Sequence, residues 1–183
     1  MRRTLYDKLL QWKSNPNRKP LILNGARQVG KTYLLLEFGR KEYDKVAFFS
    51  LDRDNMAASV FEQGGKVKDI LISLSAISNV NITPSDTLII LDEIQDCPKA
   101  LESLKYFCED APDYHVVVAG SLLGLSLHDD VSYPVGKVEE LRLFPMTYIE
   151  FLQAIGNDRL AETLTSGNWV VINMIAGEYS RLL

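Results

Sequence analysis

Four apolar runs recur along the chain, and polar or turn-forming residues separate them. The apolar positions within each run are continuous and do not alternate with polar ones, which is typical of strands buried on both faces of a parallel sheet. The four runs cover residues 21–23, 46–51, 87–91 and 116–119. A fifth segment, 138–144, alternates apolar and charged residues, and this pattern predicts a half-buried or edge strand.

Helical periodicity fills the segments between these runs. Apolar residues recur every three or four positions in segments 4–13, 33–38, 67–77 and 101–108. We expect the second of these helices to stop at Gly39, because glycine is favoured just past a helix end. Gly64 and Gly65 should break the region 55–78 into two pieces, and Pro98 should occupy the first helical position of the next helix.

A capping box predicts the start of a later helix. Thr147 and Glu150 have the required spacing, and Met146 and Phe151 are placed to form the accompanying hydrophobic staple. The pattern therefore predicts a helix over residues 148–154.

The alternation of strands and helices predicts an α/β fold. We expect a three-layer sandwich with a mostly parallel central sheet and helices on both faces. In such folds, ligands bind outside the carboxyl ends of the strands. The residues that follow each apolar run are therefore the first candidates for a site.

The first run leads into a complete G-x-x-x-x-G-K-T sequence. Its eight residues are Gly25, Ala26, Arg27, Gln28, Val29, Gly30, Lys31 and Thr32. A strand before the loop and a helix after it are the context that a phosphate-binding P-loop requires. Glycines allow positive φ and let backbone N–H groups close around an anion at a helix start. We expect these eight residues to bind the nucleotide; the alternative is a glycine-rich turn with a surface Lys-Thr pair.

Two adjacent carboxylates follow the third apolar run. Asp92 is predicted to hold a magnesium ion together with the hydroxyl of Thr32, and Glu93 to orient and polarise the attacking water. Lys31 is the candidate for the charge on the β and γ phosphates. Taken alone, the acidic pair is equally consistent with a strand end that faces solvent.

A polar residue also ends the fourth run. Ser121 is placed to sense the γ-phosphate or the attacking water, and the alternative is a helix N-cap. Candidates for stabilising transition-state charge are Arg27, Arg53, Arg142 and Lys137, among which the sequence does not choose.

Composition sets limits on the class of protein. A chain of 183 residues is long enough for one α/β core, and its net charge of −4 argues against a globally basic nucleic-acid footprint, although a local basic patch stays open. The N-terminus lacks the apolar region of a secretory signal, and the late apolar run at 169–176 is too short to span a membrane. Cys97 and Cys108 lack metal-site spacing and are expected to be reduced thiols in a cytoplasmic protein.

Other nucleotide-binding classes fit less well. The chain has neither the N-K-x-D element nor the D-x-x-G switch of a GTPase, so ATP is favoured. A P-loop kinase is harder to exclude, since kinases share the first motif. The water-activating position of Glu93 favours hydrolysis over phosphoryl transfer to another acceptor.

Four segments carry a family likeness. They are residues 21–32 (LILNGARQVGKT), 91–98 (LDEIQDCP), 119–121 (AGS) and 143–151 (LFPMTYIEF). Together they resemble a widespread group of prokaryotic AAA-superfamily ATPases, which usually carry a further, poorly characterised domain. The resemblance implies an ASCE-type P-loop NTPase core with Lys31 and Thr32 in Walker A, Asp92 and Glu93 in Walker B, and Ser121 as a sensor-like residue. Lys137 stands where many members have arginine.

The resemblance also implies a domain division. It covers about residues 1–155, which we expect to form the ATPase core with a short N-terminal helix. Members are commonly about twice as long, so residues 156–183 are expected to be a tail or the start of a further region. The apolar segment 169–175 would fold back on the core or drive self-association, as exposed apolar strands do.

Two functional hypotheses follow. The first is magnesium-dependent binding and hydrolysis of ATP, with ATP and Mg²⁺ as cofactors. The second is a regulatory or interaction module that binds the nucleotide with little turnover. A second copy of the chain or another protein is the expected partner, and neither nucleic acid nor a membrane is favoured.

Overall fold

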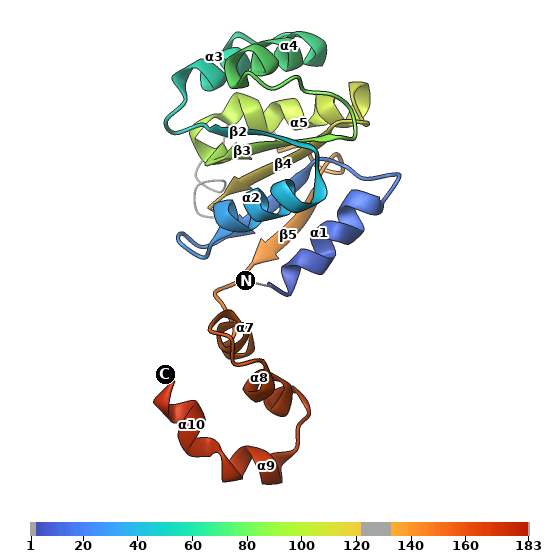
Figure 1. Cartoon of the computed structure of the whole chain (residues 1–183). Coiled ribbons are helices and arrows are strands. Elements are labelled where there is room, and N and C mark those ends of the chain that lie inside the picture. Colours follow the sequence, from blue (N-terminus) through green and yellow to red (C-terminus); the bar gives the residue numbers. More distant parts are fainter. Residues whose placement is uncertain (1–2, 122–132, 183) are drawn as a thin grey trace. The chain divides into compact units, whose positions relative to one another are not determined.

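The computed structural model of this chain describes residues 3–121 and 133–182. Its centre is a five-stranded sheet in the order β2-β3-β4-β1-β5 in which every neighbouring pair is parallel (Figure 1). The strands are β1 (Leu21–Gly25), β2 (Lys45–Ser50), β3 (Thr87–Asp92), β4 (His115–Gly120) and β5 (Glu139–Leu143). All five strands lie within one or two residues of the predicted segments, and the alternating segment β5 is an edge strand, as predicted.

Helices cover both faces of this sheet, so the predicted α/β sandwich is confirmed (Figure 1). They are α1 (Leu5–Ser14), α2 (Lys31–Glu42), α3 (Asn55–Gln63), α4 (Val67–Ser78) and α5 (Pro98–Asp110). One large apolar cluster joins α3, α4 and α5 to alternate residues of the strands, including Phe49, Ile89 and Val118. The predicted break at Gly64 and Gly65 separates α3 from α4, and Pro98 opens α5.

The predicted end of α2 at Gly39 is wrong, because α2 continues to Glu42. Gly39 is a packing residue inside the helix. A Cβ atom at Gly39 would lie 2.7 Å from Cγ2 of Val46 and 3.3 Å from Cδ2 of Leu88. The missing side chain therefore lets α2 approach β2 and β3 closely, which is a requirement for glycine that the local sequence does not reveal.

The chain divides into two compact units. One unit comprises Lys8–Phe144 and contains the sheet, and the other joins the described residues up to Asp7 to the segment that begins at Pro145. Four short helices form most of the second unit: α7 (Tyr148–Ala154), α8 (Asp158–Thr165), α9 (Trp169–Met174) and α10 (Ala176–Arg181). Their small core contains Leu152, Ala161, Ile172 and Tyr179.

Two predictions about this second unit have different outcomes. The capping box is confirmed, since Thr147 Oγ1 accepts the backbone N–H of Glu150 and the Glu150 carboxylate accepts that of Thr147. The comparison of segment 169–175 with an exposed strand is wrong, because Trp169–Met174 forms α9, while its folding back on the core or self-association stays a prediction. Asn168 caps α9 by accepting the N–H of Val171, and such a cap favours a helix over an extended strand.

Cys97 and Cys108 are free thiols, as predicted. Within residues 3–121 and 133–182, none of the helices has the length and apolar content of a membrane span. In the same residues, no three or more histidine, cysteine, aspartate or glutamate side chains gather into a metal-binding group.

Candidate functional site

The loop between β1 and α2 has two glycines with different physical roles. Gly30 has a φ of 92° and stands directly before the first residue of α2. Gly25 does not have the positive φ that its place in the motif suggests; a Cβ atom there would instead lie 2.5 Å from the carbonyl oxygen of Leu143 in β5. Gln28 is the second residue of the loop with positive φ, at 64°. Together these conformations form a tight loop that ends on the N-terminus of a helix, where N–H groups favour an anion.

The side chain of Lys31 lies against this loop. Its Nζ donates hydrogen bonds to the carbonyl oxygens of Gly25 and Ala26, at 3.0 and 2.9 Å. Burial lowers the pKa of Lys31, while the charges of Glu93 and Asp92 act in the opposite direction. Two carbonyl oxygens therefore hold Lys31 at the loop. An anion would accept stronger hydrogen bonds from Nζ than these neutral oxygens and could replace them.

Thr32 lies against the end of β3. The Thr32 hydroxyl donates a hydrogen bond of 2.7 Å to Oδ2 of Asp92, while Oδ1 accepts the backbone N–H of Glu93 at 3.1 Å. Burial raises the pKa of Asp92, and these two hydrogen bonds oppose the rise. A hydroxyl oxygen and a buried carboxylate at this distance are the hard oxygen ligands that Mg²⁺ prefers, so the residues fit the ion that the sequence implies.

Glu93 turns the chain sharply after β3. Its backbone lies in the left-handed region, with φ 53° and ψ 49°, and a short 3₁₀ turn, η1 (Ile94–Asp96), follows it. A residue with a side chain rarely adopts this conformation, and such residues cluster at functional sites. The Glu93 carboxylate accepts a hydrogen bond of 2.7 Å from Nε2 of Gln95.

Ser121 follows β4 and is buried, with 6% of its surface exposed. Its backbone N–H donates to Oε1 of Gln95 at 3.3 Å. The alternative of a helix N-cap depends on residues after Ser121, which lie outside the described residues. Gln95 received no role from the sequence, although it belongs to the Asp-Glu-Ile-Gln segment. A polar residue two positions after the acidic pair was the available signal.

The four candidate cations lie in different surroundings. Arg53 pairs with Asp52 at 3.3 Å, and Lys137 pairs with Glu109 at 2.8 Å. Arg142 lies over the ring of Phe144, with 5.0 Å from its Cζ to the ring centroid. Arg27 is exposed on the loop, and its charge contributes to the lowered pKa of Lys31. Of the four, Arg27 therefore has the closest electrostatic relation to the loop.

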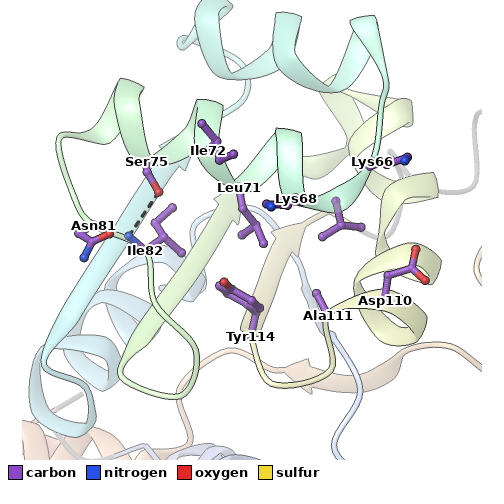
Figure 2. Close-up of a pocket in the computed structure, with 11 residues that line it drawn as sticks. Lys66, Lys68, Leu71, Ile72, Ser75, Asn81, Ile82, Asp110, Ala111 and Tyr114 are labelled. Atoms are coloured by element: carbon purple, nitrogen blue, oxygen red, sulfur yellow. Dashed lines mark hydrogen bonds between the residues drawn. The ribbon is translucent and has the colours of Figure 1, made fainter.

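A separate pocket of about 780 Å³ lies beside α4 and the turn between α5 and β4 (Figure 2). None of the candidate nucleotide-site residues lines it. Its lining includes the buried side chains of Val67, Leu71 and Ile82, and Ser75 Oγ accepts the N–H of Ile82 at 3.3 Å. Such an apolar floor offers no cradle of N–H groups for phosphate, so this pocket is not the nucleotide site.

Comparison with known proteins agrees with this geometry. A family model described as an AAA domain matches residues 17–152. The search of curated proteins found no match. Among solved structures, the chain is similar to the Drosophila ORC bound to DNA, at 16% identity and a TM-score of 0.56, with 87% of this chain and 47% of that chain covered.

A second solved structure has the same kind of similarity. It is the Aeropyrum pernix ORC1 protein in complex with DNA, at 17% identity and a TM-score of 0.52, with 84% of this chain and 47% of that chain covered. The chain therefore spans about half the length of these two proteins. At these identities the likeness shows the fold.

Proposed function

The chain belongs to the AAA domain family of ATP-binding modules, and we propose that it hydrolyses ATP in a magnesium-dependent reaction. The observation that carries this proposal is the hydrogen bond between Thr32 and Asp92, because it joins the start of α2 to the end of β3 beside Lys31. A metal-binding pair next to a phosphate loop is what nucleotide hydrolysis requires.

Binding of the nucleotide is assigned to the loop 25–32. Its backbone N–H groups and the N-terminus of α2 attract the phosphates, and Lys31 exchanges its carbonyl partners for phosphate oxygens. Thr32 and Asp92 would hold the magnesium ion, which supplies charge neutralisation between the β and γ phosphates. The two residues already face each other, so the chain needs little rearrangement to present both oxygens.

The chemical step is assigned to Glu93 and Ser121. Glu93 accepts the proton of the attacking water and orients that water toward the γ-phosphate. Ser121 lies at the end of the neighbouring strand β4, where its side chain would contact the γ-phosphate or the water. Both residues follow the carboxyl ends of central strands, which is where ligands bind in α/β folds.

A titration with a fluorescent ATP analogue, with and without magnesium, tests this proposal when phosphate release is followed in the same samples. Lys31→Ala should weaken binding by about 10-fold or more, since it removes the charge that faces the phosphates. Lys99→Ala, which changes an exposed lysine paired with Glu102, is the matched control. An unchanged affinity in Lys31→Ala would contradict the assignment of the loop.

A regulatory module with little turnover is the second candidate. It is favoured by the surroundings of Arg53 and Lys137, which are each paired with a carboxylate of this chain. In that case the wild-type chain binds the analogue through Lys31 and releases no phosphate. The same titration therefore distinguishes the two candidates.

The proposal extends to the organisation and surroundings of the chain. We assign residues 1–155 to the ATPase module and 156–183 to a tail or the beginning of a further region. A protein partner or a second copy is proposed for the exposed apolar side chains of Trp169, Val170 and Met174. The two free cysteines agree with a cytoplasmic location.

DNA is not proposed as a partner, because the net charge of −4 gives no overall attraction for phosphate backbones. The two ORC proteins were solved with DNA, but their likeness to this chain shows only a common fold. DNA binding that weakens steeply with added salt would contradict this part of the proposal.

A further inference from the structure

The side chain of Gln95 bridges the two residues to which the chemical step is assigned. Its Nε2 donates to Oε2 of Glu93 at 2.7 Å, and its Oε1 accepts the backbone N–H of Ser121 at 3.3 Å. Glu93 follows β3 and Ser121 follows β4, so one amide group connects the ends of two neighbouring strands.

The surroundings of this amide determine its orientation. Nε2 faces two carboxylates, because it also donates to Oδ2 of Asp96 at 2.9 Å, and Oε1 faces an N–H donor. The reverse orientation would place an oxygen against both carboxylates and an NH₂ group against the N–H of Ser121. All three contacts would then be repulsive, so the orientation follows from the network.

The backbone around the bridge provides the space for it. A Cβ atom on Gly120 would lie 2.9 Å from Oε1 of Gln95 and 2.8 Å from Cγ2 of Ile94. The left-handed conformation of Glu93 turns the chain into η1, and the fully buried Ile94 anchors that turn. Gln95 is thus held against the end of β4 by packing as well as by hydrogen bonds.

We infer that Gln95 is a positioning residue that orients the Glu93 carboxylate and links its orientation to the end of β4. This inference rests on the proposed hydrolysis, in which Glu93 acts on the attacking water. A displacement of Ser121 toward a γ-phosphate would move the acceptor side of the amide, and the donor side would move Glu93 with it. The bridge therefore links contact between Ser121 and the γ-phosphate to the position of the Glu93 carboxylate.

The first test separates turnover from binding. Gln95→Met keeps the length of the side chain and removes all three hydrogen bonds. Gln95→Glu keeps an acceptor for Ser121 but removes the donor to Glu93 and Asp96. Both variants should lower kcat by about 10- to 100-fold, because misplacing a catalytic group by about 1 Å can have an effect of this size. The affinity for a fluorescent ATP analogue with magnesium should stay within about twofold of wild type. Gln63→Met, at the exposed end of α3, is the control.

The second test detects the bridge without relying on turnover. In NMR spectra of the wild-type chain, the side-chain amide protons of Gln95 should exchange with water more slowly than those of Gln63. The backbone amide signal of Ser121 should shift in Gln95→Met and stay unchanged in Gln63→Met.

The two tests separate the bridge from the proposed hydrolysis. An NMR signature without phosphate release by the wild-type chain supports the bridge and contradicts hydrolysis. Phosphate release by Gln95→Met at the wild-type kcat overturns the positioning role, and so does fast exchange of the Gln95 amide protons. A loss of affinity equal to the loss of kcat also overturns it, because that pattern indicates a general disturbance of the site.

Discussion

Thr32 and Asp92 are 60 residues apart in the sequence, yet the hydroxyl of Thr32 lies 2.7 Å from Oδ2 of Asp92. The two residues come from the first turn of α2 and the last position of β3. Asp92 is only 5% exposed, so its carboxylate depends on its few hydrogen-bond donors. This pair is the observation on which the proposed magnesium site rests.

Thr32→Val should reduce the gain in nucleotide affinity that magnesium produces by about 10-fold or more. The change keeps the shape of the side chain and removes the hydroxyl oxygen that the ion would use. The measurement is the affinity for the ATP analogue over a series of magnesium concentrations. Thr32→Ser restores the hydroxyl and should restore the dependence. An unaltered magnesium series in Thr32→Val would remove Thr32 from the metal site.

Glu93→Gln should lower phosphate release by about 10²- to 10⁴-fold and leave binding of the analogue in place. The amide has nearly the size of the carboxylate but cannot accept the proton of the attacking water. Phosphate release under single-turnover conditions measures the chemical step directly. Glu102→Gln, at a half-buried position of α5 beside Lys99, provides a control of the same chemistry. Rapid release by Glu93→Gln would exclude Glu93 as the base.

Gly25→Ala should lower the free energy of unfolding by about 1–3 kcal/mol, because the new methyl group meets the carbonyl oxygen of Leu143 at 2.5 Å. Affinity for the nucleotide should fall as well, since the loop begins at Gly25. Urea unfolding measures the change in stability. Gly177→Ala is the contrasting variant: it has open space and an ordinary φ within α10. If both variants unfold at the same urea concentration as wild type, the close approach at Gly25 has no energetic importance.

His115 should make the sheet unit less stable in mild acid. Burial lowers the pKa of His115 to about 4, and the positive charges of Arg18 and Lys13 add to the effect. Below pH 6.5 the unfolded chain binds a proton that the folded chain does not. The free energy of unfolding should therefore fall by about 2 kcal/mol from pH 6.5 to 4, after allowance for partial solvent screening.

Trp12 provides a signal for this measurement, because its ring centroid lies 5.8 Å from that of His115. Urea unfolding is followed by Trp12 fluorescence in a Trp169→Phe background, which removes the other tryptophan. His115→Gln retains a hydrogen-bonding partner for the hydroxyl of Tyr43, which lies 2.6 Å from Nδ1 of His115. The free energy of unfolding of the protein with His115, relative to that of His115→Gln, should then fall by about 2 kcal/mol as the pH falls from 6.5 to 4. A constant difference over this range would contradict the low pKa of His115.

Glu150→Gln should lower the free energy of unfolding of the second unit by about 2–3 kcal/mol. The Glu150 carboxylate accepts hydrogen bonds from the N–H and hydroxyl of Thr4, at 2.8 and 2.9 Å, and from the N–H of Thr147 at 2.9 Å. An amide would turn its NH₂ group toward one of these donors and leave that donor unsatisfied. Hydrogen exchange over residues 145–182 measures the change. The exposed Glu162, changed to Gln in α8, is the control, and equal exchange in both variants would show that the contact with Thr4 adds no stability.

Most of the fold follows from local pattern. The four apolar runs became β1 to β4, and the alternating segment became the edge strand β5. The strand order could not be predicted in this way, because the pairing of β1 with β4 depends on contacts between residues 96 positions apart. Periodicity records which face of a strand is buried and contains no information on which strand is its neighbour.

Two errors have a common physical cause. Gly39 has the composition signal of a helix end, but tertiary packing against Val46 and Leu88 explains its presence inside α2. Segment 169–175 has the apolar run of a strand, but the cap at Asn168 and the small core around Ile172 make it helical. Tertiary contacts outweighed the local preference at Gly39, whereas at 169–175 a local helix cap acted together with tertiary packing.

Part of the candidate site could be located from the sequence and part could not. The P-loop and the acidic pair could be located by sequence because each residue type has a fixed place relative to a strand end. The bridge that Gln95 makes could not be predicted, because Glu93 and Ser121 lie at the ends of different strands and meet only through the pairing of β3 with β4.

The contact between Thr4 and Glu150 has a consequence for biosynthesis. The two residues are 146 positions apart, and at about 5–20 residues per second the ribosome adds the second roughly 7–30 s after the first. Every strand of the sheet, up to Leu143, is translated within that interval. The first four strands are translated by Gly120, 30 residues before Glu150, so they can pair before the segment that begins at Pro145 captures the N-terminal residues. The order of translation thus favours folding of the nucleotide-binding unit ahead of the unit that joins the two distant segments.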